Sequence, residues 1–200
     1  WPNGDEVLVL EADPSGGSLA GWLDTPSQPS LATIIANVGA DAGLDDRSTL
    51  ATLESMTRRS RAGVRFVPNA VRSRAAHRAV DEAAAAVLPA LAVADSTVLV
   101  DLGAHRGGPG PSTALHVADA VVVVHRQATA SAAAATVRIE RLVESIEDLA
   151  RLDADFVLAV IGNTPFGAGE IGAFVDDSVP GAVRRVAAMA DDPLAAATVA

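Results

Sequence analysis

Thr97-Val98-Leu99-Val100-Asp101-Leu102-Gly103 is the stretch that decides the fold. It is mostly apolar, several of its side chains are β-branched, and turn-forming residues follow it. A short apolar run of this kind predicts a strand of a parallel sheet, because helices cover both faces of such a strand. We therefore expect an α/β fold in which this strand is buried.

Asp101 interrupts the apolar run near its carboxyl end. Open α/β sheets bind ligands in the crevice beyond the carboxyl ends of their strands, and Gly103 allows a sharp turn or a close approach to a ligand. Asp101 is therefore a candidate to hold Mg²⁺ or a water at a nucleotide-phosphate site. The alternative is that Asp101 only caps the following turn, as Asp often does.

A second apolar run, Glu6 to Ala12, also ends in a carboxylate and a turn, with the sequence Asp13-Pro14-Ser15-Gly16-Gly17. Two parallel strands that each deliver an Asp to a glycine-bearing turn would place two carboxylates around one site. The alternative for Asp13 is that it simply starts a turn before Pro14.

The remaining pattern alternates strands and helices. Further strands are predicted at 64–68, 119–124, 156–161 and 182–189, the last with a helix as the alternative. Helices are predicted at 18–23, 31–37, 48–59, from after Arg78 to about Ala94, at 131–152, at 170–177 and from 191 onward. This order predicts a doubly wound, mostly parallel sheet flanked by helices, in a single domain over residues 1–200.

Composition excludes several classes of protein. The 200 residues carry a net charge of −10, which argues against a surface that binds nucleic acid over most of its area. Non-specific DNA binding through Arg72, Arg74 and Arg78 stays open, although a solvated helix face is favoured. The chain has no cysteine, hence no disulfide or thiolate metal site. No run is long enough to predict a membrane span, so we expect a cytoplasmic protein.

Lysine is absent from all 200 residues. A Walker-type phosphate loop needs a glycine-rich turn followed by a Lys that reaches the phosphates. Residues 1–200 therefore contain no such loop, and we expect the chain as it stands to be inactive as an ATPase.

The order of motifs resembles the MinD/ParA family of deviant Walker, SIMIBI-class P-loop ATPases. The segment Glu11-Ala12-Asp13-Pro14-Ser15-Gly16-Gly17 is similar to the segment that follows the phosphate loop in that family, and residues 95–103 are similar to its Walker B strand. The resemblance continues through Ala118-Asp119, Gly162-Asn163-Thr164 and Ala188 to Pro193. It implies that the first strand and its phosphate loop lie upstream of Trp1, and that the chain is also cut short after Ala200.

The resemblance also implies roles for particular residues. Asp13 would orient the attacking water, and Asp101 would hold Mg²⁺ through a water, as a carboxylate does when Mg²⁺ keeps most of its hydration shell. Asn163 would hydrogen-bond the adenine edge, with an Asn in a left-handed turn as the alternative. The other residues implied in nucleotide binding are Glu11, Gly16, Asp192 and Pro193.

Two functional hypotheses follow. In the first, the chain is part of an ATPase that uses ATP/ADP and Mg²⁺, forms a nucleotide-gated homodimer, and works with protein partners as a positional switch in chromosome partitioning, cell division or secretion. In the second, it is a pseudo-ATPase, an interaction module that has kept the fold and lost nucleotide binding. A Rossmann oxidoreductase is disfavoured because no strand is followed by the full glycine fingerprint. Residues 194–200 lack the basic face of a membrane-binding helix.

Overall fold

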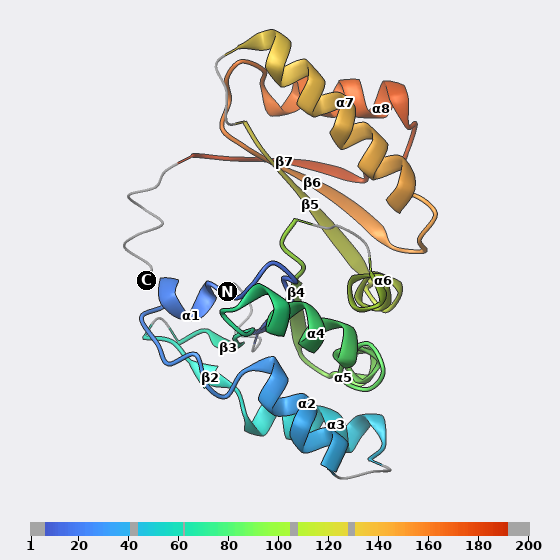
Figure 1. Ribbon diagram of the computed structural model, residues 1–200. Helices are drawn as coiled ribbons and strands as arrows, with labels where there is room; N and C mark the ends of the chain where they lie inside the picture. The colour runs from blue at the N-terminus through green and yellow to red at the C-terminus, as the bar shows by residue number, and fades with distance from the viewer. Residues whose placement is uncertain (1–6, 41–43, 62, 105–107, 128–130, 192–200) are drawn as a thin grey trace. The chain divides into compact units, whose positions relative to one another are not determined.

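The computed structural model describes residues 7–40, 44–61, 63–104, 108–127 and 131–191 (Figure 1). Among these residues the chain forms two compact units, unit 1 up to Val117 and unit 2 from Ala118 to Asp191. Each unit is described here by itself.

The sheet of unit 1 has the strand order β2-β3-β1-β4. Strand β1 (Val7–Glu11) pairs in parallel with β3 (Arg65–Val67) and with β4 (Thr97–Asp101), while the short β2 (Arg58–Arg59) is antiparallel to β3. The register sets Glu11 opposite Asp101. The carboxyl ends of β1 and β4 therefore lie at the same edge of the sheet, each followed by one of the predicted glycine-bearing turns.

Helices pack against this sheet to form one apolar core. Its fully buried side chains include Leu8 and Leu10 of β1, Leu53 and Val80. The helices of unit 1 are α1 (Leu19–Trp22), α2 (Leu31–Ala40), α3 (Asp46–Ser55), α4 (Ser73–Ala83), α5 (Val87–Ala90), the 3₁₀ turn η1 (Leu91–Val93) and α6 (Pro109–His116).

Strand β4 is less buried than the sequence predicts. Val98 and Val100 pack against the core, whereas Leu99, which points to the opposite face, is 44% exposed. Within the described residues β4 pairs only with β1, so it is an edge strand. The prediction of a strand buried on both faces was wrong because an apolar run does not reveal whether its strand lies inside a sheet or at its edge.

Unit 2 contains three parallel strands in the order β5-β6-β7. These are β5 (Ala120–Arg126), β6 (Asp155–Ile161) and β7 (Arg185–Met189). Helices α7 (Ala132–Leu149) and α8 (Ala168–Ser178) lie together on one face of this sheet (Figure 1). Ile139 and Ile146 of α7 meet Leu158 of β6 and Ile171 of α8 in its core.

The predicted fold class is confirmed: both sheets are mostly parallel and flanked by helices. The predicted strands β5, β6 and β7 are confirmed as well, so the alternative of a helix at 182–189 is wrong. In place of one continuous sheet, the described residues form two. That residues 1–200 make a single domain stays a prediction.

Two predicted helices end earlier than expected. The helix predicted from after Arg78 to about Ala94 begins earlier, at Ser73, and is divided into α4, α5 and η1. Pro89, which cannot donate a backbone hydrogen bond, lies in α5. The helix over 48–59 ends at Ser55, and Arg58 and Arg59 belong to β2. Here pairing with β3 outweighs helix propensity, which is a weak guide on its own. Of the helices in the described part of the chain, none has the length and apolar character needed to cross a bilayer.

His125 makes the stability of unit 2 sensitive to pH. Partial burial in β5, with a smaller contribution from the positive charge of Arg138, lowers the pKa of His125 below its ordinary value of 6.5. The unfolded chain therefore binds a proton more readily than the folded one. We expect the free energy of unfolding to be highest above pH 6.5 and to fall as the pH drops through 6.5 toward the lower pKa of the folded state. Urea unfolding of the wild type and of His125→Val between pH 8 and pH 5 checks this; parallel curves would contradict it.

Candidate functional site

Asp13 lies just beyond the carboxyl end of β1, in a turn that it helps to build. Its Oδ1 accepts a hydrogen bond from the Ser15 backbone N–H at 2.7 Å, and its carbonyl accepts one from the Gly16 N–H at 3.2 Å. The Ala12 N–H donates to the Asp101 carbonyl at 2.8 Å, which extends the β1–β4 pairing past the strand ends. Asp13 therefore does start a turn, and this turn leaves its side chain only partly buried at the predicted edge.

Asp101 occupies the corresponding position at the end of β4. It is exposed, and its Oδ1 accepts a hydrogen bond from the Gly103 N–H at 2.9 Å, so it does cap the following turn. Gly103 has a φ of +58°, and a Cβ there would overlap the carboxylate of Asp13. The structure thus brings together the two predicted strand-end motifs: the carboxylate of Asp13 lies against the backbone two residues beyond Asp101.

Glu11 has a different environment from the other carboxylates. Its side chain is 2% exposed. Its Oε1 accepts hydrogen bonds from the N–H groups of Ser18 and Leu19, both at 2.7 Å, and its Oε2 accepts one from the Asn69 N–H at 2.9 Å. The carboxylate is thus solvated by backbone donors of its own chain, and its predicted contact with a nucleotide stays a prediction.

Asn69 belongs to this site but was missed from the sequence. It follows β3 by two residues, is 1% exposed, and donates from Nδ2 to the Asp13 carbonyl at 3.0 Å. A signal was available, because Asn69 is a polar residue placed directly after a predicted strand, as Asp13 is. The predicted Gly16 contacts the same region: a Cβ there would come within 2.8 Å of the Val71 carbonyl oxygen. The chain's own packing therefore excludes a side chain at this position.

The predicted base-side residues fall in unit 2. Asn163 is exposed in the turn that follows β6, after Gly162, whose N–H donates to the Met189 carbonyl at 3.0 Å. Asp191 accepts a hydrogen bond from Arg126 at 2.8 Å, which ties the segment after β7 to the end of β5. Asp192 and Pro193 lie outside the described residues.

Gln127 is a second residue that sequence analysis missed. It is 9% exposed and follows β5 directly. Its Nε2 donates to the carbonyls of Gly162 at 3.3 Å and Phe166 at 2.5 Å, and its Oε1 accepts from the Phe166 N–H at 3.2 Å. A single side chain thus fastens both ends of the segment 162–166 that carries Asn163.

The exposed carboxylate of Asp101, at the end of β4, is a suitable donor for Mg²⁺. This ion usually keeps several waters and binds through one or two carboxylates together with substrate phosphates. In the described part of the chain, no group of three or more His, Cys, Asp or Glu side chains could hold a metal by themselves. Asp101 therefore fits a magnesium ion that arrives with a phosphate ligand better than a metal enclosed by protein.

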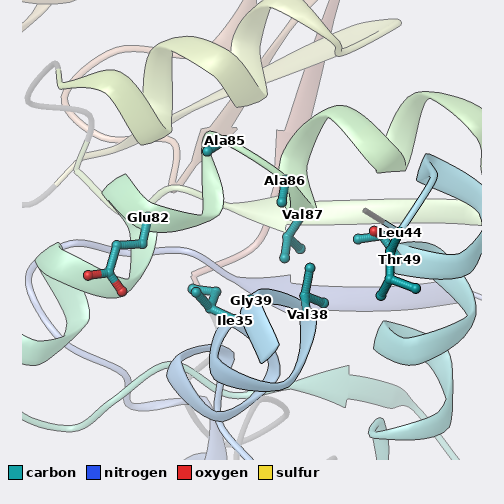
Figure 2. A pocket seen from close by; sticks show the side chains of 9 residues that line it. All are labelled: Ile35, Val38, Gly39, Leu44, Thr49, Glu82, Ala85, Ala86 and Val87. Carbon is teal, nitrogen blue, oxygen red and sulfur yellow. The ribbon is translucent and has the colours of Figure 1, made fainter. Parts of the chain in front are cut away.

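A hollow of about 280 Å³ in unit 1 lies elsewhere (Figure 2). Its lining is mostly apolar, with Ile35, Val38 and Val87 among the side chains. The only carboxylate in the lining, Glu82, is paired with Arg78 at 2.7 Å. None of the predicted site residues lines this hollow.

Comparisons with known proteins identify the fold. No protein-family model matches the chain, and no curated protein matches it in sequence. Among solved structures, cobyrinic acid a,c-diamide synthase from Mycobacterium smegmatis with a bound ATP analogue and magnesium matches with a TM-score of 0.53, at 14% identity over 88% of this chain and 71% of the other. The same enzyme with ADP and magnesium also matches with a TM-score of 0.53, at 15% identity over 88% of this chain and 70% of the other. At these identities the likeness shows the fold alone, an α/β fold of mostly parallel sheets flanked by helices.

The contact between Gly103 and Asp13 gives the first prediction from the site. We expect Gly103→Ala to destabilise unit 1, because a positive φ costs a non-glycine residue about 1–2 kcal/mol and the new methyl would also displace the Asp13 carboxylate. Gly21→Ala in α1 is the matched control, since a Cβ there meets nothing within 4 Å. Chemical denaturation measures both variants, and equal stability would contradict the close contact.

The hydrogen bonds of Gln127 give the second prediction from the site. Gln127→Leu keeps the size of the side chain but removes the partners of the partly buried backbone groups of Gly162 and Phe166, and each hydrogen bond typically contributes about 0.5–1.5 kcal/mol. We expect lower stability and faster amide exchange at Phe166. Asn163→Ala, at an exposed position, is the control and should change stability by less than about 0.5 kcal/mol. If the two variants unfold alike, Gln127 does not hold this segment.

Proposed function

We propose that this chain is the ATPase-like part of a nucleotide-dependent switch, in which Asp13 orients the attacking water and Asp101 holds Mg²⁺ through a water. The observation that carries the proposal is the placement of Asp13 against Gly103 at the carboxyl ends of β1 and β4. Ligands of open α/β sheets bind at this edge. The solved structures of similar fold contain an ATP analogue or ADP with magnesium, which supports the same class of ligand here.

Asp13 and Asp101 would have separate roles in the reaction. The turn at 13–16 holds the carboxylate of Asp13 toward the edge of the sheet, where it can accept a hydrogen bond from a water. Asp101 keeps one oxygen on the Gly103 N–H, which fixes its direction. Magnesium, when bound, would offset phosphate charge. Catalysis of phosphoryl transfer is mostly positioning and electrostatic stabilisation. The roles of Asp13 and Asp101 would therefore support hydrolysis only when other groups hold the phosphates in place.

We propose that the phosphates of the nucleotide are held by a strand and a lysine-bearing phosphate loop upstream of Trp1. Strand β4 supports this: its run is apolar on both faces, yet Leu99 is 44% exposed and, within the described residues, β4 is paired on one side only. A further parallel strand beside β4 would complete its pairing in unit 1. Its carboxyl end would deliver the phosphate loop next to Asp101 and Asp13.

The remaining parts of the proposal concern the base, the partners and the location. Asn163 would contact the adenine, with Glu11, Gly16, Asp192 and Pro193 as further predicted nucleotide contacts. Two copies would associate when ATP is bound and act with a protein partner of a partitioning, division or secretion system in the cytoplasm. The acidic net charge of −10 disfavours DNA as that partner.

Isothermal titration calorimetry with Mg-ATP and Mg-ADP tests the proposal. It should be run on residues 1–200 and on a longer protein that includes the natural residues upstream of Trp1. We expect only the longer protein to bind. Asp101→Asn should raise the Mg²⁺ concentration that binding requires. Asp13→Asn should bind normally but hydrolyse ATP about 100-fold more slowly, the lower end of what a positioned proton acceptor contributes.

Asp148→Asn is the matched control, because it makes the same change of charge at an exposed position of α7. It should leave both binding and hydrolysis unchanged. If neither form of the wild-type protein binds nucleotide, the ATPase proposal fails, and the pseudo-ATPase interaction module takes its place. If the longer protein binds nucleotide, gel filtration with ATP and with ADP decides whether association of two copies depends on the nucleotide.

A further inference from the structure

The buried carboxylate of Glu11 connects three separate pieces of unit 1. It ends β1, and its two oxygens accept hydrogen bonds from Ser18 and Leu19 at the start of α1 and from Asn69 after β3. A charged group that is 2% exposed is tolerated only where hydrogen bonds replace the lost water. These three donors therefore cannot leave the carboxylate without a large cost in free energy.

Asn69 extends this network to Asp13. Its backbone N–H binds Glu11, its Nδ2 donates to the Asp13 carbonyl at 3.0 Å, and its Oδ1 accepts from the Ala70 N–H at 2.8 Å. The Ala70 carbonyl in turn accepts from the Gly17 N–H at 2.8 Å. The segment between β1 and α1 is thus attached to residues 69 and 70 both at Asp13 and at Gly17.

The fit between these segments leaves no free space. A Cβ at Gly17 would come within 2.6 Å of the Asn69 carbonyl oxygen and within 2.6 Å of Glu11 Oε2. The backbone at Gly17 is therefore packed directly on both members of the network. Because interiors packed this closely transmit displacements rather than absorb them, a shift of Asn69 moves the turn that holds Asp13.

We infer that Asn69 is a positioning residue, which together with Glu11 fixes the backbone of Asp13 and so the direction of its carboxylate. The inference deepens the proposed function and rests on it for its effect on turnover. Asn69 touches neither water nor phosphate in this role; it acts through the Asp13 carbonyl. A misplacement of about 1 Å far from the reacting atoms can cost roughly 100-fold in rate, so loss of this contact should slow hydrolysis without weakening binding.

Amide hydrogen exchange on residues 1–200 tests the network without any nucleotide. Asn69→Ser keeps a polar side chain that is too short to reach the Asp13 carbonyl, and it should speed exchange at Ser15, Gly17, Ser18 and Leu19 while leaving β1 protected. Asn37→Ser is the matched control, because Asn37 also donates from Nδ2 to a backbone carbonyl, that of Thr33 at 2.8 Å, but on the exposed surface of α2. It should not change exchange in this segment.

Glu11→Gln provides a second variant should Asn69→Ser fail to fold. It keeps the shape of the side chain but sets an amide group among three backbone donors, so exchange should rise in the same segment. Unchanged exchange at Ser15 to Leu19 in either folded variant would overturn the inference.

Turnover in the longer protein with the upstream residues tests the effect on Asp13. Asn69→Ser should lower kcat about 10- to 100-fold while the KM for Mg-ATP and its Kd stay within about threefold of the wild type. A loss in Kd equal to the loss in kcat would make Asn69 a merely structural residue and overturn the inference. If the wild type binds no nucleotide, the proposed function fails, and the exchange experiment still decides whether Asn69 fixes the Asp13 turn.

Discussion

The candidate site of unit 1 depends on the burial of one charged group, the carboxylate of Glu11. Three backbone N–H groups from two distant segments replace its water. Loss of these hydrogen bonds would leave a charge unsolvated in the interior. The backbone from Ala12 to Leu19 is therefore held in one low-energy conformation. The place of Asp13 at the edge of the sheet is thus set by the buried carboxylate of Glu11, two positions before it.

In unit 2, a neutral side chain fixes the loop at the end of a strand. Gln127 has both a donor and an acceptor, so it binds carbonyl and N–H groups of the segment 162–166 at the same time. A neutral amide also avoids the desolvation cost of a carboxylate. In each unit, a buried polar side chain at the end of a strand fastens the loop that presents a more exposed polar residue, Asp13 in one and Asn163 in the other.

Much of this arrangement could be predicted from the sequence, and the failures have physical causes. The apolar runs locate β1, β4, β5 and β6, and the rule that parallel strands end at one edge brings Asp13 and Asp101 together. Asn69 and Gln127 were missed because their partners lie 58 and 39 residues away in sequence, at Glu11 and Phe166. The position of Asn69 after a predicted strand is a local signal, but local patterns do not identify the partners, and a buried amide is defined by its partners rather than by its neighbours in sequence.

Charge sets a limit on what these residues can do for a nucleotide. At the candidate site, Asp13 and Asp101 add negative charge beside the place proposed for the phosphates. Two like charges 4 Å apart repel by about 4 kcal/mol near a protein surface, so a bare triphosphate would be driven from this edge. Magnesium reverses that sign, since carboxylates and phosphates are both ligands for it. The residues described here therefore suit the magnesium and the water of the reaction, and the positive charge that grips the phosphates has to come from groups other than these.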